Sequence, residues 1–135
     1  MVFPNRSSNR GGRCRGGAAA ELVAVAPLLL FILIVAIDFC RLFFDYTIIT
    51  NAARNGALYA SDPRYQSLYA NFQAAALADA NNLNPALTAA NVTSSGPTGG
   101  QVSVTVQYQF NMMSAYLGFS NVNLSRTVWM RVAPP

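Results

Sequence analysis

Two acidic side chains border the one long uncharged run of this chain, and they are its best candidates for chemistry. Residues 22–37 carry no charged or polar side chain, Glu21 precedes them and Asp38 follows them. A carboxylate in hydrocarbon costs roughly 2.5–3.5 kcal/mol at the centre of a membrane span and less near its end. The helix dipole favours an early acid by only about 0.3–1 kcal/mol and does not require one after three alanines. We therefore expect Glu21 to pair with a fixed cation.

A second group of charges lies just beyond the uncharged run. Asp38, Arg41 and Asp45 are spaced i, i+3 and i+7, so one helical face holds all three and Arg41 can reach both acids. Aromatic residues surround them, which is typical of a membrane–water interface. We interpret the group as an interfacial salt-bridge cluster in preference to an assembly contact.

The composition argues against an enzyme. The chain has no histidine, which is the commonest general base and metal ligand. No Gly-rich phosphate loop or pair of head-domain carboxylates is evident, since Asp62 resembles a helix cap and Asp79 a surface charge. We expect no catalytic residue, no metal site and no cofactor, and a membrane-tethered enzyme is disfavoured.

The charge distribution predicts a membrane topology. Residues 17–44 are apolar over the roughly 20 positions that a bilayer span needs. Of the arginines that precede this segment, Arg13 and Arg15 are nearest to it, and basic residues beside a span stay in the cytoplasm. The arginines beyond the span are balanced by acids, so no nucleic-acid-binding face is expected. The N-terminus should be cytoplasmic and the C-terminus extracytoplasmic.

The remainder of the chain predicts a small α+β head. A helical apolar stripe should continue to about residue 59, and a second amphipathic helix is expected over 63–80. Residues 91–95, 101–110 and 122–132 alternate or are β-prone, which predicts a short antiparallel sheet covered by the helices. A loop between the last two strands is unusually apolar and is expected to pack in the core or to face the membrane. Its apolar residues are Met112, Met113, Tyr116, Leu117 and Phe119.

Four segments follow from these patterns. We predict a cytoplasmic leader over 1–16, a transmembrane segment over 17–44, an extracytoplasmic continuation of the helix over 45–61 and a head domain over 62–135.

The N-terminal third of the chain resembles a known family. The segment GGAAAELVAVAPLLLFILIVAIDFCRLFF, followed by NAARNGALYA, is similar to the N-terminus of TadE-like minor pseudopilins of tight-adherence (Flp-type) pilus systems. The features in common are the Arg-Gly end of a leader, Glu21, Pro27, the Leu-rich core and the Asn-Ala-Ala-Arg run at 51–54. Leu22 differs from the family pattern, in which an aromatic residue is usual.

The resemblance implies a processed membrane protein with a pilin-like fold. A prepilin peptidase would cut between Gly16 and Gly17, with Glu21 and Leu22 as recognition residues and Glu21 as the fifth residue of the product. Glu21 would then pair with the new amine of a neighbouring subunit. The implied partners are the peptidase, other pseudopilins, the major pilin, the inner-membrane assembly platform and the lipid bilayer. The implied location is the bacterial inner membrane or the pilus itself.

Two other readings remain open. The chain could be an unprocessed single-pass membrane protein, or a secreted protein with a removable signal peptide. The second is disfavoured because the apolar run is long and the residues after it, Asp-Phe-Cys-Arg, offer no small-x-small cleavage site.

Overall fold

The computed structural model describes residues 15–65, 67–118 and 120–134 of the chain. It confirms the predicted α+β class, with one long helix, a second short helix and a three-stranded antiparallel sheet. Its elements are, in order, α1 (Arg15–Ser61), η1 (Pro63–Tyr65), α2 (Phe72–Ala78), η2 (Ala89–Asn91), β1 (Val92–Thr98), β2 (Gln101–Phe110), η3 (Met113–Leu117) and β3 (Val122–Arg131). The chain divides into two compact units, Met1–Ala36 and Ile37–Pro135.

The described part of the first unit is the N-terminal portion of α1. This helix is long and apolar enough to cross a membrane, and most of the side chains in its apolar portion are exposed. The helix is unbroken at Pro27, so the local unwinding that a proline could cause is absent from this described segment. Membrane helices tolerate such a proline because neighbouring groups re-satisfy the freed carbonyl.

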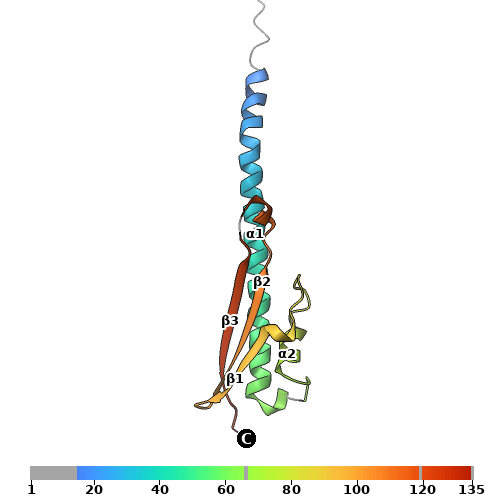
Figure 1. Cartoon of the computed structure of the whole chain (residues 1–135), viewed down its shortest axis with the longest axis vertical. Helices are drawn as coiled ribbons and strands as arrows, with labels where there is room; N and C mark the ends of the chain where they lie inside the picture. The colour runs from blue at the N-terminus through green and yellow to red at the C-terminus, as the bar shows by residue number, and fades with distance from the viewer. Residues whose placement is uncertain (1–14, 66, 119, 135) are drawn as a thin grey trace, which may run out of the picture. The chain divides into compact units, whose positions relative to one another are not determined.

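The second unit is built on a meander of three antiparallel strands in the order β1-β2-β3 (Figure 1). Central strand β2 alternates as predicted, with Val104, Val106 and Phe110 at most 1% exposed on its inner face. Its outer face is polar, and Thr105 there exchanges a 2.8 Å hydrogen bond with Thr127 of β3. The sheet therefore has one face against the core and one in water.

The C-terminal portion of α1 covers the inner face of the sheet through small side chains. Ala52, Ala53 and Ala57 are fully buried, as is Ile49 one turn earlier. A Cβ added at Gly56 would lie 3.2 Å from Val104 Cγ1 of β2 and 3.2 Å from the carbonyl oxygen of α2's first residue. The alanines and this glycine allow α1 to approach the sheet and α2 closely.

The second helix is shorter than predicted. The expected helix over 63–80 is wrong: the chain forms the single turn η1, then turns, and then the seven-residue α2. Asn71 is the physical reason, because its backbone is extended and its side-chain oxygen accepts a 2.7 Å hydrogen bond from Ala74 N. An N-cap of this type starts a new helix and cannot lie inside a longer one.

Two residues after β3 form backbone hydrogen bonds, one to the end of α1 and one to the turn between β1 and β2. Ala133 N donates to the carbonyl oxygen of Ser61 at 2.8 Å, and Val132 N donates to that of Gly100 at 2.9 Å. Because carbonyls at a helix C-terminus lack intrahelical partners, the bond to Ser61 satisfies one of them.

Candidate functional site

Glu21 and its neighbours are open to solvent or to a partner. Gly17, Glu21 and Leu22 are exposed, and a Cβ added at Gly17 would meet no atom within 4 Å. Among the described residues, Glu21 forms no hydrogen bond and no ion pair. Its carboxylate is therefore open to a cation from another molecule, and the predicted pairing stays a prediction.

The structure describes only some of the other residues around the predicted processing site. Gly16 and Arg15 lie in the first turn of α1, whereas Arg13 lies outside the described residues. The processing site and the topology signal remain predictions.

Asp38 is the most deeply buried acid of the described residues. Its side chain is 1% exposed, although its neighbours Phe39 and Ile37 are exposed. Asp38 Oδ1 accepts a 2.8 Å hydrogen bond from Met113 N, and Asp38 Oδ2 accepts one of equal length from Ser114 N. These amides are the first two of η3, where backbone N–H groups have no partner within the helix. Asp38 therefore caps η3 from a position 75 residues earlier in the chain.

Arg41 completes this arrangement from the solvent side. Its Nη1 lies 3.6 Å from Asp38 Oδ1, and its guanidinium carbon lies 5.3 Å from the centroid of the Phe110 ring. The arginine side chain is 42% exposed, so the ion pair is screened on one side. The group joins α1, β2 and η3.

Asp45 does not join the ion pair. The prediction that Arg41 reaches both acids holds only for Asp38, because among the described residues no cation lies within 4 Å of Asp45. Asp45 is 9% exposed and lies near Tyr108, whose buried hydroxyl has no hydrogen-bond partner among the described residues. Burial raises the pKa of Tyr108, and the negative charge of Asp45 raises it further while Arg41 opposes the rise.

The Asn-Ala-Ala-Arg run at 51–54 presents two different faces. Its alanines are in the core, as described above, while its polar residues line an open groove of about 570 Å³ between α1 and the chain around α2. Asn55 Nδ2 donates a 2.7 Å hydrogen bond to Ala75 O, which fixes α2 to α1. The groove is lined by Ile48, Asn51, Arg54, Asn55, Leu58, Tyr69 and Asp79.

The described residues contain no group of three His, Cys, Asp or Glu side chains that could hold a metal ion. The arrangement at Asp38 is also saturated by its own chain. The geometry therefore shows structural capping at Asp38, whereas ionic pairing at Glu21 stays a prediction.

The capping of η3 by Asp38 was not predicted. Spacing within α1 pairs Asp38 with Arg41, and sequence alone gives no register between residue 38 and residue 113. The apolar character of the loop at 112–119 was the one available sign that this loop is not an ordinary solvated connection.

Comparison with known proteins supports the family. Residues 16–58 match the family model described as TadE-like protein. No curated protein and no solved structure is significantly similar to the chain. The match contains Glu21, Asp38 and the Asn-Ala-Ala-Arg run, and it ends within α1. Over residues 16–58, the chain is therefore similar to TadE-like proteins, in agreement with the resemblance in its sequence.

Proposed function

We propose that this chain is a minor pseudopilin that acts in assembly of a tight-adherence (Flp-type) pilus or a related secretion apparatus. The observation that carries the proposal is an exposed Glu21, with no hydrogen-bond or ion-pair partner among residues 15–65, 67–118 and 120–134, in an apolar helix whose sequence matches the TadE-like family model. A carboxylate in such a helix is costly unless a cation meets it. Subunit pairing would supply that cation and would set the register of assembly.

The cation would come from processing. A prepilin peptidase of the inner membrane would cut between Gly16 and Gly17 and expose the amine of Gly17. Glu21 of one subunit would then pair with the amine of the next. Gly17 is exposed, and among the described residues the position that a Cβ would take there is open, which supports access to this position.

The proposed orientation is N-terminus in the cytoplasm and C-terminus outside. Arg13 and Arg15 would hold the leader on the cytoplasmic face. The head, which begins where the apolar run ends, would then meet the pilins and other pseudopilins on the outer side. The inner-membrane assembly platform would contact the cytoplasmic end of the helix.

Replacement of Glu21 tests the pairing in the host. In a strain that lacks the gene, Glu21→Ala should restore the membrane level of the protein but not the pili, counted by electron microscopy. Val25→Ala is the matched control, since Val25 is exposed on the same helix and carries no charge. Normal piliation with Glu21→Ala would overturn the pairing, and normal piliation of the deletion strain would overturn the function.

A further inference from the structure

One end of the second unit exposes a set of large apolar side chains. Phe39, Phe43 and Phe44 of α1 are 54–64% exposed, and Met113 and Tyr116 of η3 are 51% and 97% exposed. We refer to these five residues as the interfacial patch. A fully exposed tyrosine gains nothing from the fold of its own chain, so its position calls for another environment.

The position of η3 is fixed by Asp38. The two 2.8 Å hydrogen bonds from Met113 N and Ser114 N hold the start of η3 against α1 at residue 38. Residue 38 immediately follows the uncharged run 22–37. If that run lies in the hydrocarbon of a bilayer, the start of η3 lies close to the boundary between hydrocarbon and headgroups, because it is bound to residue 38.

The chemistry of the patch fits that depth. Aromatic residues are enriched where a membrane protein crosses from lipid to water, because their rings are apolar and their edges or hydroxyls are polar. Arg41 presents a partly exposed guanidinium at the same level, and such a group is suited to lipid phosphate. The outer face of the sheet, by contrast, is lined mostly by threonine, serine, asparagine and glutamine side chains, and its one large exposed apolar residue, Trp129, lies near the other end of β3.

We propose that the interfacial patch rests in the membrane–water interface, so that η3 acts as a second membrane contact that seats the head on the bilayer. The occupant of this surface is the lipid boundary between headgroups and acyl chains. The proposal rests on insertion of α1, which is part of the proposed function. Asp38 would position the contact without touching lipid, since its side chain is buried.

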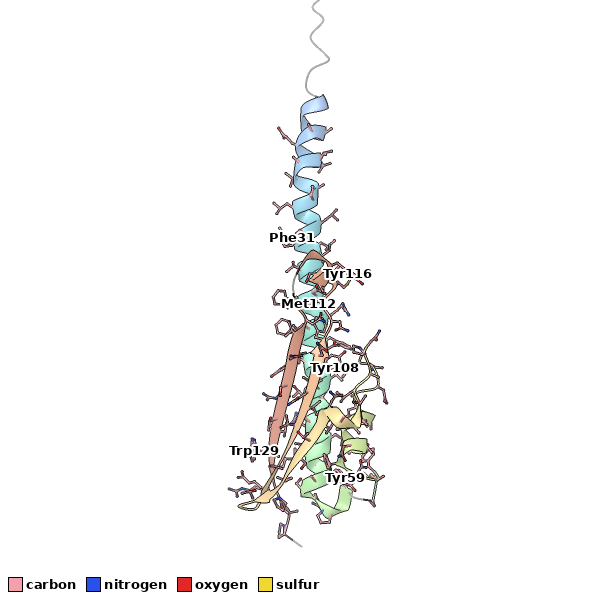
Figure 2. All side chains as sticks on the ribbon, viewed as in Figure 1. Phe31, Tyr59, Tyr108, Met112, Tyr116 and Trp129 are labelled. Carbon is pink, nitrogen blue, oxygen red and sulfur yellow. The ribbon has the colours of Figure 1, made fainter. Side chains whose placement is uncertain are left out.

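Single-tryptophan proteins test this contact in lipid. Trp129 is the only tryptophan of the chain, and Figure 2 shows it at the end of the head opposite Tyr116. Trp129 lies seven residues beyond the start of β3, which is about 23 Å at ~3.3 Å per residue. The wild-type protein therefore supplies an internal control far from the patch.

Two variants complete the set, each in a Trp129→Phe background. Tyr116→Trp places the probe in the patch, and Phe31→Trp places it within the apolar run. The full-length proteins are incorporated in phosphatidylcholine vesicles at a low protein-to-lipid ratio. The acyl chains of this lipid are brominated either close to the headgroup or near the chain end.

We expect three distinct responses. Bromine close to the headgroup should quench mainly the emission of the tryptophan at position 116. The deeper bromine should quench mainly the emission of the tryptophan at position 31. Neither bromine should quench Trp129. Quenching at 31 without quenching at 116 would overturn the lipid contact while leaving membrane insertion intact. Absence of quenching at 31 would instead overturn insertion, and with it the proposed function.

A contact with another subunit is the competing outcome. In that case emission from position 116 would be unquenched in dilute vesicles and would shift to the blue as the protein-to-lipid ratio rises. This result would assign the patch to a second copy of the chain and would overturn the lipid contact.

Discussion

Removal of the buried Asp38 carboxylate should strongly destabilise the head. Asp38→Ala deletes both acceptors of the 2.8 Å hydrogen bonds from η3 and the 3.6 Å ion pair with Arg41. Water can reach Met113, which is half exposed, but Ser114 is 1% exposed. The variant therefore leaves the amide of Ser114 buried without a partner.

The size of the effect follows from these contacts. A hydrogen bond to a charged group contributes about 1.5–3 kcal/mol, and an orphaned buried donor costs about 1–3 kcal/mol. The half-exposed ion pair adds at most about 1 kcal/mol. Because water recovers one of the two amides, we expect a loss of about 3–4 kcal/mol in the free energy of unfolding. That is a large part of the 5–15 kcal/mol typical of a domain.

Urea unfolding in detergent micelles measures this loss, with Trp129 fluorescence as the probe of β3. With a denaturant dependence of about 1–3 kcal/mol per molar, the unfolding midpoint should fall by roughly 2 M. The unfolding midpoint of Asp38→Asn, which keeps one acceptor oxygen, should lie between those of the wild type and Asp38→Ala. Asp79→Ala, an exposed acid without a side-chain hydrogen bond, is the control and should change the midpoint little. A midpoint for Asp38→Ala equal to that of Asp79→Ala would refute the capping role.

Three further changes test the packing and the charges of the head. Gly56→Ala should lower the free energy of unfolding by about 1–2 kcal/mol, because overpacking outweighs the gain of about 1 kcal/mol in helix propensity; a more stable variant would contradict the close approach. Asn71→Ala should cost about 0.5–2 kcal/mol through loss of the cap on Ala74 N, and an unchanged urea midpoint would argue against it. Hydrogen bonds from Arg64 lower the pKa of Asp62. The pair therefore stabilises the head at pH values above the ordinary carboxyl pKa, and this stabilisation is lost as the pH falls through the lowered pKa. Arg64→Gln should return the pKa of Asp62 toward its ordinary value in an NMR titration, and an unmoved pKa would exclude Arg64 as the cause.

Local patterns in the sequence predict most of the head. The alternation of Val102 to Phe110 predicts β2 at its observed bounds, because a strand with one buried face has a period of two. The Asp62-Pro63 pair correctly predicts a helical start, and Asp62 Oδ1 does accept a hydrogen bond from Arg64 N. The apolar stripe that continues to about residue 59 likewise predicts a face of α1 that packs on the sheet, where Ile49, Ala53 and Ala57 are buried.

Contacts between distant residues account for what the sequence did not predict. Asp38 and Arg41 are correctly paired by helical spacing, but the acceptor role of Asp38 depends on how the chain returns to α1 after β2. The apolar pattern of 63–80 outweighed Asn71 in the prediction, whereas in the fold the cap at Asn71 decides where α2 begins. Arg126 stands opposite the buried Val106, where the alternation of β3 would place an apolar residue; it lies in an edge strand and donates to the Tyr46 hydroxyl at 3.4 Å.

The segment that matches the family model extends into the part of α1 that packs in the head. The match ends at residue 58, whereas Asn55 binds α2 and Gly56 contacts the sheet. The matched segment therefore includes the surface on which the head is built. This arrangement explains why small residues recur in a stretch of helix that lies beyond the apolar run.

Processing of the leader tests the proposed function most directly. The measurement is the intact mass of the protein extracted from membranes of a host with and without its prepilin peptidase. We predict loss of residues 1–16 only when the peptidase is present, with Gly17 as the new N-terminus. A full-length mass in both samples would contradict processing and leave a single-pass membrane protein, whereas a cut after Ala36 would indicate a secreted protein.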